Sequence, residues 1–182
     1  CEKASSILDI GCGTGLITLM LGQRNLNSII TGIEIDKIAS QEAQLNISNS
    51  DWKARIVIKH TSLQHFIPKL KFDLIVSNPP FFSPNESQKS RDIARRTNSL
   101  SFEELIGSTA RILSEKGIFS VIIPKNAEEY FYKIASVHNL YRNRVCYIKG
   151  NMTSVIKRVM VEFSFIKSIV SYEYLTIEKS RH

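Results

Sequence analysis

A glycine-rich turn near the amino terminus constrains the fold of this chain more than any other feature. The short apolar run at residues 6–10 leads into the sequence DIGCGTG at residues 9–15, and an apolar stretch with helical recurrence follows at residues 16–23. Alternating glycines let the backbone turn sharply and come close to a ligand that side chains would exclude. The pattern therefore predicts a buried strand, a tight turn that holds a nucleotide-like ligand, and a helix.

The rest of the sequence alternates β-branched runs with helical stretches. We expect strands at residues 29–35, 55–59, 72–77, 118–123, 143–148 and 158–165, and helices at residues 37–47, 101–113 and 126–137. Ser101 and Glu104 form a capping box for the second of these helices, and Gly117 suits its exit. Asn126 with Glu129 is expected to begin the last helix. This order is typical of an α/β fold with a mostly parallel sheet between helices, closed by an antiparallel pair.

Composition favours one globular domain spanning residues 1–182. The chain is 43% hydrophobic, which suffices for a core, and it has no run of about 18 apolar residues that would cross a membrane. Cys1, Cys12 and Cys146 are too widely spaced for a disulfide framework or a zinc site. We therefore expect a cytoplasmic monomer with neither a membrane anchor nor a metal.

The charge of +7, with a pI of about 9.4, suits a polyanionic partner. Residues 82–100 lack periodicity and are interpreted as a long surface loop or lid, which carries Lys89, Arg91, Arg95 and Arg96. A later stretch without acids carries Arg142, Arg144, Lys149, Lys157 and Arg158. Both are candidate contacts for RNA phosphates, and a solvated basic face is the alternative.

Two acidic residues, one before the glycine turn and one at the end of the next expected strand, indicate the kind of ligand. Asp9 would repel a pyrophosphate, so S-adenosylmethionine, which has a cationic sulfonium and amine but no phosphate, fits better than a dinucleotide. Glu34 ends the second strand about 20 residues beyond the turn, where a carboxylate accepts hydrogen bonds from both ribose hydroxyls. A tight turn that binds nothing, with a surface carboxylate, is the alternative.

The sequence NPPF beginning at Asn78 follows the fourth expected strand, at the sheet edge where α/β folds bind ligands. Pro79 and Pro80 restrict the backbone, so the Asn78 side-chain carbonyl and the Pro79 backbone carbonyl can converge on one amino group. Such acceptors would draw a conjugated amine towards tetrahedral geometry without a strong base. Phe81 and Phe82 are placed to stack on a target base, whereas the plain alternative is a strand-ending turn with a core Phe.

Together, the turn, Glu34 and NPPF resemble class I N6-adenine and related amino-methyltransferases. Residues 16–24, 43–52 and 72–77 and the segment bearing Arg95 resemble the bacterial tRNA(Val) adenine-N6 methyltransferases, which modify adenine 37 beside the anticodon. The resemblance implies a Rossmann-like, doubly wound, mostly parallel seven-stranded sheet with one antiparallel strand. It also implies S-adenosylmethionine as cofactor and tRNA as partner.

The same resemblance assigns the site residues. The implied cofactor-binding residues are Asp9, Gly11, Gly13, Gly15, Glu34, Ile35, Ser62 and Asn78. The implied catalytic residues are Asn78, Pro79, Pro80 and Phe81. The implied RNA contacts are Phe82, Lys89, Arg91, Arg95 and Arg96. Ser62 or a backbone amide replaces the acid that many relatives carry after the third strand, and we expect the sequence to be truncated at both ends relative to them.

Two other functions fit parts of the pattern. Release-factor glutamine and ribosomal guanine-N2 methyltransferases use similar Asn-Pro-Pro-aromatic elements, and a non-catalytic RNA-binding domain could retain a vestigial pocket. Intact Asn78 and Glu34 argue against the second alternative. The residues thus favour methylation of an amine, while adenine in tRNA rests on the resemblance and on the basic loop.

Overall fold

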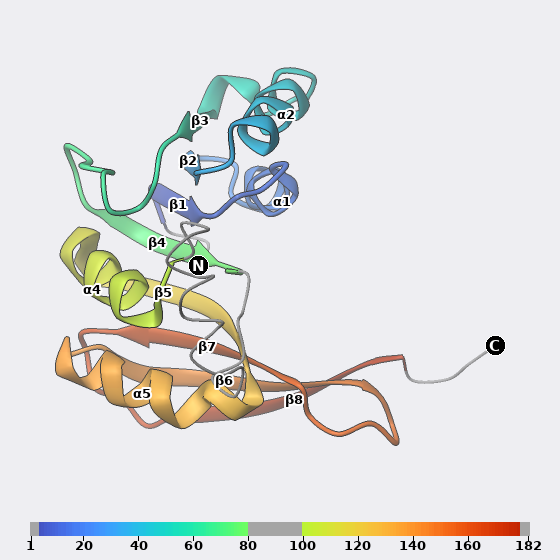
Figure 1. Cartoon of the computed structure of the whole chain (residues 1–182), viewed down its shortest axis with the longest axis vertical. Helices are drawn as coiled ribbons and strands as arrows, with labels where there is room; N and C mark the ends of the chain where they lie inside the picture. The colour runs from blue at the N-terminus through green and yellow to red at the C-terminus, as the bar shows by residue number, and fades with distance from the viewer. Residues whose placement is uncertain (1–3, 80–99, 179–182) are drawn as a thin grey trace, which may run out of the picture. The chain divides into compact units, whose positions relative to one another are not determined.

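The structure, a computed structural model, describes residues 4–79 and 100–178 (Figure 1). The strands of the described residues are β1 (Ser6–Ile10), β2 (Ile29–Glu34), β3 (Ile56–His60), β4 (Phe72–Ser77), β5 (Leu113–Pro124), β6 (Tyr141–Asn151), β7 (Arg158–Ser164) and β8 (Ser171–Glu178). Their helices are α1 (Leu16–Arg24), α2 (Lys37–Ser48), α4 (Phe102–Ile112) and α5 (Glu128–Val137), with 3-10 turns η1 (Lys53–Arg55) and η2 (Lys125–Ala127). These elements give the α/β class that the sequence predicts.

The described strands form one eight-stranded sheet in the order β3-β2-β1-β4-β5-β7-β6-β8. The chain divides into two compact units, and β5 contributes residues to both. The first unit contains Cys1–Asn78 and Ser108–Phe119, and the second contains Pro79–Gly107 and Ser120–His182. The prediction of a mostly parallel sheet is confirmed, but the expected seven strands are too few because β8 adds another at the edge.

In the first unit, β1 pairs in parallel with β2 and β4, and β2 pairs in parallel with β3. The strand interiors are buried, with Ile7, Ile30 and Ile75 fully inaccessible, and Ala43 and Ile47 of α2 pack in one core cluster with Ile7 and Ile30. Burial on both faces explains why these strands read as nearly continuous apolar runs. Parallel pairing also brings the carboxyl ends of all four strands to one edge.

Asp73 anchors the opposite end of β4. Its Oδ2 accepts hydrogen bonds from the backbone N–H and hydroxyl groups of both Ser5 and Ser6, and Ser114 Oγ donates to its Oδ1 at 3.3 Å. The hydrogen bond from the Ser5 hydroxyl is the main interaction that lowers the pKa of this carboxyl. Asp73 therefore joins the start of β1 to the start of β4 and lies away from the carboxyl edge.

In the second unit, β6 lies between β7, with which it pairs antiparallel, and β8, with which it pairs in parallel. The expected antiparallel pair is thus confirmed, although it does not end the sheet. Most residues of β8 are exposed on both faces, so no alternating apolar pattern marks this strand in the sequence. Sequence reasoning missed it for that reason.

The helix boundaries test three local expectations. The capping box is confirmed, because Glu104 N donates to Ser101 Oγ at 3.2 Å and Ser101 N donates to Glu104 Oε2 at 3.0 Å. Gly117 does not end the helix, since α4 gives way to β5 at Leu113 and Gly117 lies inside that strand. Asn126 does not cap α5, which begins after Ala127 without a side-chain cap.

A buried carboxylate, that of Glu128, lies at the start of α5 instead of a capping side chain. Glu128 forms an ion pair with Lys125, and its Oε1 accepts hydrogen bonds from Tyr132 Oη at 2.8 Å and Tyr147 Oη at 3.0 Å. Hydrogen bonds from α5 and β6 converge on this one side chain, so a tertiary network takes the place of a local cap.

We expect Gly117→Ala to lower the free energy of unfolding by about 1–3 kcal/mol, because overpacking a tight site forces the backbone to shift. A Cβ here would lie 2.9 Å from the backbone oxygen of Phe72 and 2.7 Å from Leu113 Cδ1. Urea unfolding measures the change. Gly150→Ala is the matched control, since its Cβ would approach only Ser154 Oγ at 3.5 Å, and equal losses in the two variants would contradict the packing argument.

Candidate active site

The glycine turn after β1 leaves open space above its backbone. Gly11 and Gly13 have φ of 69° and 55°, a left-handed conformation that costs other residues free energy, and a Cβ on either would meet no atom of the described residues within 4 Å. Gly15, with φ of 87°, differs because its Cβ would come within 3.3 Å of Ala43 Cβ. Gly11 and Gly13 therefore border free volume that a ligand can fill, whereas Gly15 permits close packing of α1 against α2.

Glu34 fastens this turn to the end of β2. Its Oε2 accepts a hydrogen bond from Gly13 N at 2.9 Å, and its Oε1 accepts one from Asp36 N at 2.9 Å. The sequence indicates a carboxylate for ribose hydroxyls at this position, and the structure adds that both oxygens already hold backbone N–H groups. Each carboxylate oxygen can accept more than one hydrogen bond, so these contacts leave capacity for a ligand.

Asp9 lies beneath the turn, only 1% exposed, and accepts a hydrogen bond on Oδ2 from Thr18 Oγ1 at 2.6 Å. Burial raises the pKa of the Asp9 carboxyl to about 6, and the nearby Glu34 charge acts in the same direction, whereas the Thr18 hydrogen bond opposes them. Sequence reasoning missed Thr18, because a threonine within an apolar helix reads as core. Burial likewise raises the pKa of the neighbouring Cys12 thiol to about 12.

The ends of β2 and β3 carry the remaining expected cofactor residues. Ile35 is 42% exposed, and its carbonyl oxygen lies 3.0 Å from His60 Nε2. Ser62 follows β3, and its Oγ lies 2.9 Å from His65 Nδ1. Thr61 N donates to Glu34 O at 2.9 Å, which holds the two strand ends together. The two histidines therefore shape the loops beside the expected site, although no pattern in the sequence indicates a role for them.

Asn78 directly follows β4 at the carboxyl edge, and it is exposed. Ser77 pairs with Ile10 in the β1–β4 register, and its Oγ donates to Ile10 O at 3.0 Å, so Asn78 lies one residue beyond the strand pair that leads into the glycine turn. Pro79 is buried. Seven other expected site residues lie outside the described residues: Pro80, Phe81, Phe82, Lys89, Arg91, Arg95 and Arg96.

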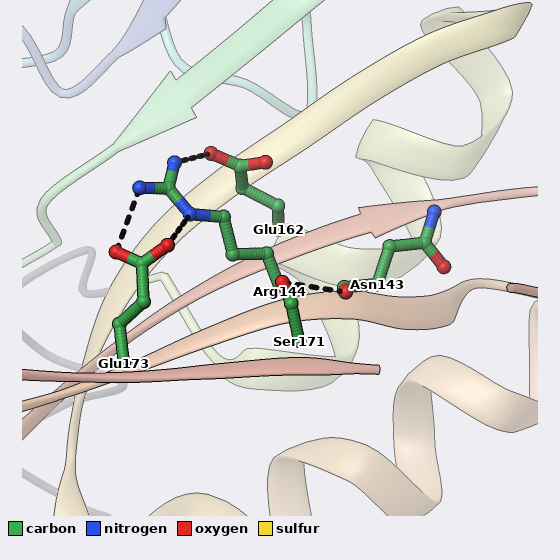
Figure 2. A network of polar contacts seen from close by, with 5 residues as sticks. All are labelled: Asn143, Arg144, Glu162, Ser171 and Glu173. Atoms are coloured by element: carbon green, nitrogen blue, oxygen red, sulfur yellow. Dashed lines mark hydrogen bonds and ion pairs between the residues drawn. The ribbon is translucent and has the colours of Figure 1, made fainter. Parts of the chain in front are cut away.

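Two arginines of the second basic stretch contact other side chains of the protein. Figure 2 shows the Arg144 guanidinium between two carboxylates, with Nε 2.8 Å and Nη2 2.9 Å from the oxygens of Glu173 and Nη1 3.0 Å from Glu162 Oε1. The Arg142 guanidinium lies 4.6 Å from the centre of the Tyr132 ring. Two acidic residues that are distant in the sequence therefore pair with Arg144, and the prediction that this stretch contacts RNA phosphates stays a prediction.

Within residues 4–79 and 100–178, no group of three or more His, Cys, Asp or Glu side chains is arranged to hold a metal ion. Among the helices of the described residues, none has the length and apolar character needed to cross a membrane.

The sequence matches a family of known proteins. The methyltransferase small domain pattern matches residues 2–142. The sequence is 42% identical to the tRNA1(Val) (adenine(37)-N6)-methyltransferase of Christiangramia forsetii, covering 97% of this chain and 76% of that protein. The protein of the same name from Flavobacterium psychrophilum is 44% identical, with 97% and 77% covered. The chain belongs to this methyltransferase family.

Solved structures agree on the fold. A predicted O-methyltransferase from Agrobacterium tumefaciens has a TM-score of 0.75 at 16% identity, covering 97% of this chain and 82% of that one. The N-methyltransferase NodS from Bradyrhizobium japonicum, in complex with S-adenosyl-L-homocysteine, has a TM-score of 0.64 at 17% identity, with 88% and 77% covered. Membership of the methyltransferase family makes S-adenosylmethionine the cofactor. The open space over Gly11 and Gly13 among the described residues, with the Glu34 carboxyl bound to Gly13 N beside it, fits a nucleoside ligand.

We expect Glu34→Gln to weaken S-adenosylmethionine binding at least about tenfold, because an amide nitrogen would face a backbone N–H and leave a donor unpaired. Isothermal titration calorimetry measures the dissociation constant. Glu42→Gln, which changes an exposed carboxyl on α2, is the matched control. Unchanged affinity in the Glu34 variant would remove this carboxylate from the cofactor site.

Proposed function

We propose that the protein transfers a methyl group from S-adenosylmethionine to the exocyclic N6 of an adenine in tRNA, namely adenine 37 beside the anticodon of tRNA(Val). The exposed Asn78 side chain at the carboxyl end of β4, adjoining the glycine turn, is the observation that carries the proposal. Relatives at 42% and 44% identity are named for this reaction, which supports the choice of adenine and tRNA.

Cofactor binding divides among residues of the first unit. The backbones of Gly11 and Gly13 border the ligand volume, Glu34 accepts hydrogen bonds from the ribose hydroxyls, and the Asp9 carboxylate attracts the cationic amino acid portion. Ile35, at 42% exposure, offers an apolar surface at the end of β2, and Ser62 contributes a hydroxyl at the end of β3. The bound cofactor supplies an activated methyl group on a sulfonium.

The chemistry at the amine requires orientation more than a base. Asn78 and Pro79 each offer a carbonyl that accepts one hydrogen of the amino group, which draws the nitrogen lone pair out of the ring. The cofactor, when bound, would supply the methyl carbon for this lone pair and would leave as the thioether, and the amine would lose one proton to water. Phe81 stacks the adenine and Phe82 forms the other wall, with positioning as the main source of rate.

The proposed partner is tRNA, bound through the basic segment of the sequence that carries Lys89, Arg91, Arg95 and Arg96. A base in a hairpin loop is already partly unstacked, which lowers the cost of presenting it to the site. The protein is proposed to act as a cytoplasmic monomer built from a single domain.

Transfer from radiolabelled S-adenosylmethionine tests the substrate directly. The protein is incubated in parallel with unmodified tRNA(Val), ribosomal RNA and a release factor, and the labelled RNA is digested to nucleosides for mass spectrometry. N6-methyladenosine in tRNA is the expected product. Label in guanine would indicate a ribosomal guanine-N2 methyltransferase, and label in the release factor a glutamine methyltransferase. No transfer to any substrate would favour a non-catalytic RNA-binding protein.

We expect Asn78→Ala to lower kcat/KM for tRNA methylation by about 10²-fold or more, because it removes one of two acceptors at the amine. Cofactor affinity, measured separately by calorimetry, should stay within about threefold of the wild type. Asn27→Ala, at an exposed turn before β2, is the matched control. Full activity of the Asn78 variant would rule out this mechanism.

Replacing Arg95 and Arg96 together by Ala should weaken tRNA affinity and reduce its dependence on salt, because removal of one phosphate interaction lowers the slope of log K against log salt by about 0.9 or less. Filter binding at several salt concentrations measures the slope. Arg144→Gln provides the contrast, since Glu162 and Glu173 already occupy that guanidinium. A slope that falls only in the Arg144 variant would move the RNA-binding surface to the second unit.

A further inference from the structure

Thr18 joins α1 to the carboxylate beneath the cofactor turn. Its side chain is fully buried in the first helical turns, and its Oγ1 donates to Asp9 Oδ2 at 2.6 Å. On the strands beside Asp9, the β2 and β4 residues in register are Gly32 and Val76. Neither of those two side chains can donate a hydrogen bond, so the polar contact to this carboxyl comes from the helix.

Burial and the titratable neighbours of Asp9 disfavour its ionised form. Burial is the largest influence and raises its pKa, and the Glu34 carboxylate at the end of β2 adds to the rise. The Cys12 thiol of the turn stays neutral at physiological pH, because burial and the Asp9 charge raise its own pKa to about 12. The Thr18 hydrogen bond is the main opposing influence, and with it the pKa of Asp9 is about 6.

We propose that Thr18 is a positioning residue, whose hydrogen bond holds the buried Asp9 carboxylate in place for the cationic amino acid portion of S-adenosylmethionine, so that cofactor affinity depends on the protonation of Asp9. The inference rests on the cofactor part of the proposed function and is independent of the RNA substrate. The buried Thr18 hydroxyl of α1 would thus stabilise the carboxylate that attracts the cofactor.

The sign of the pH dependence follows from linkage. A cationic ligand favours the ionised carboxylate, so the proton leaves Asp9 on binding, and affinity is highest between the pKa of the free protein and that of the ligand's own amino group, about 8. Below about pH 6 the affinity falls up to about tenfold per pH unit. Without the Thr18 hydroxyl, a buried carboxylate is deprived of its main stabilising hydrogen bond, so the midpoint moves to higher pH by about one unit.

The experiment is calorimetric titration between pH 5.5 and pH 8.5, in the absence of RNA, of the wild type, Thr18→Val and Thr18→Ser. The ligands are S-adenosylmethionine and 5′-methylthioadenosine, which has the same nucleoside but carries neither the sulfonium nor the amino acid. Thr109→Val is the matched control, since Thr109 is also fully buried and its hydroxyl has no hydrogen-bond partner among the described residues. Thermal melting verifies that each variant is folded.

The expected result is a midpoint near pH 6 for S-adenosylmethionine in the wild type and the Thr109 variant, raised by about one unit in Thr18→Val and restored in Thr18→Ser. Affinity for 5′-methylthioadenosine should not follow these midpoints. Equal weakening of both ligands at every pH would overturn the proposal and make Thr18 a packing residue.

The wild type also provides a test that needs no variant. A flat pH profile for S-adenosylmethionine would overturn the inference even if Thr18→Val failed to fold. Because no RNA is present, failure of tRNA methylation would leave these outcomes unaffected.

Discussion

Strand β1 pairs in parallel with β2 on one side and with β4 on the other, and every part of the candidate site follows from that arrangement. Parallel strands end at the same edge, so the glycine turn, Glu34 and Asn78 lie along one edge of the sheet although they are far apart in the sequence. Asp73 fixes the opposite ends of β1 and β4 through Ser5 and Ser6. The buried interior of the sheet thus determines the positions of the residues that we propose to contact the ligand.

Much of the fold follows from local sequence patterns. The turn after β1, the apolar strands of the first unit and the capping box at Ser101 each depend on a few adjacent residues, and all are present. The missed features depend on distant contacts. Strand β8 is exposed and lacks alternation, and at the start of α5 tyrosines of α5 and β6 donate hydrogen bonds to the Glu128 carboxylate.

The candidate site also contains residues that local sequence patterns predict and contacts that they do not. Gly11, Gly13 and Glu34 could be predicted because their spacing reflects the turn they make, and the structure brings them together. The Thr18 hydrogen bond could not, since nothing in the helical pattern shows that its hydroxyl meets a carboxylate nine residues earlier. The pairing of Arg144 was equally hidden, because its acidic partners follow 18 and 29 residues later on other strands.

The two backbone hydrogen bonds that Glu34 accepts have a consequence for the thermodynamics of binding. A long side chain that becomes ordered only when a ligand arrives loses rotamer freedom, which costs about 0.5–1.5 kcal/mol of affinity. Glu34 is already held between Gly13 N and Asp36 N, so that entropy is lost during folding. A nucleoside that binds there as proposed would meet a carboxylate that is already in place.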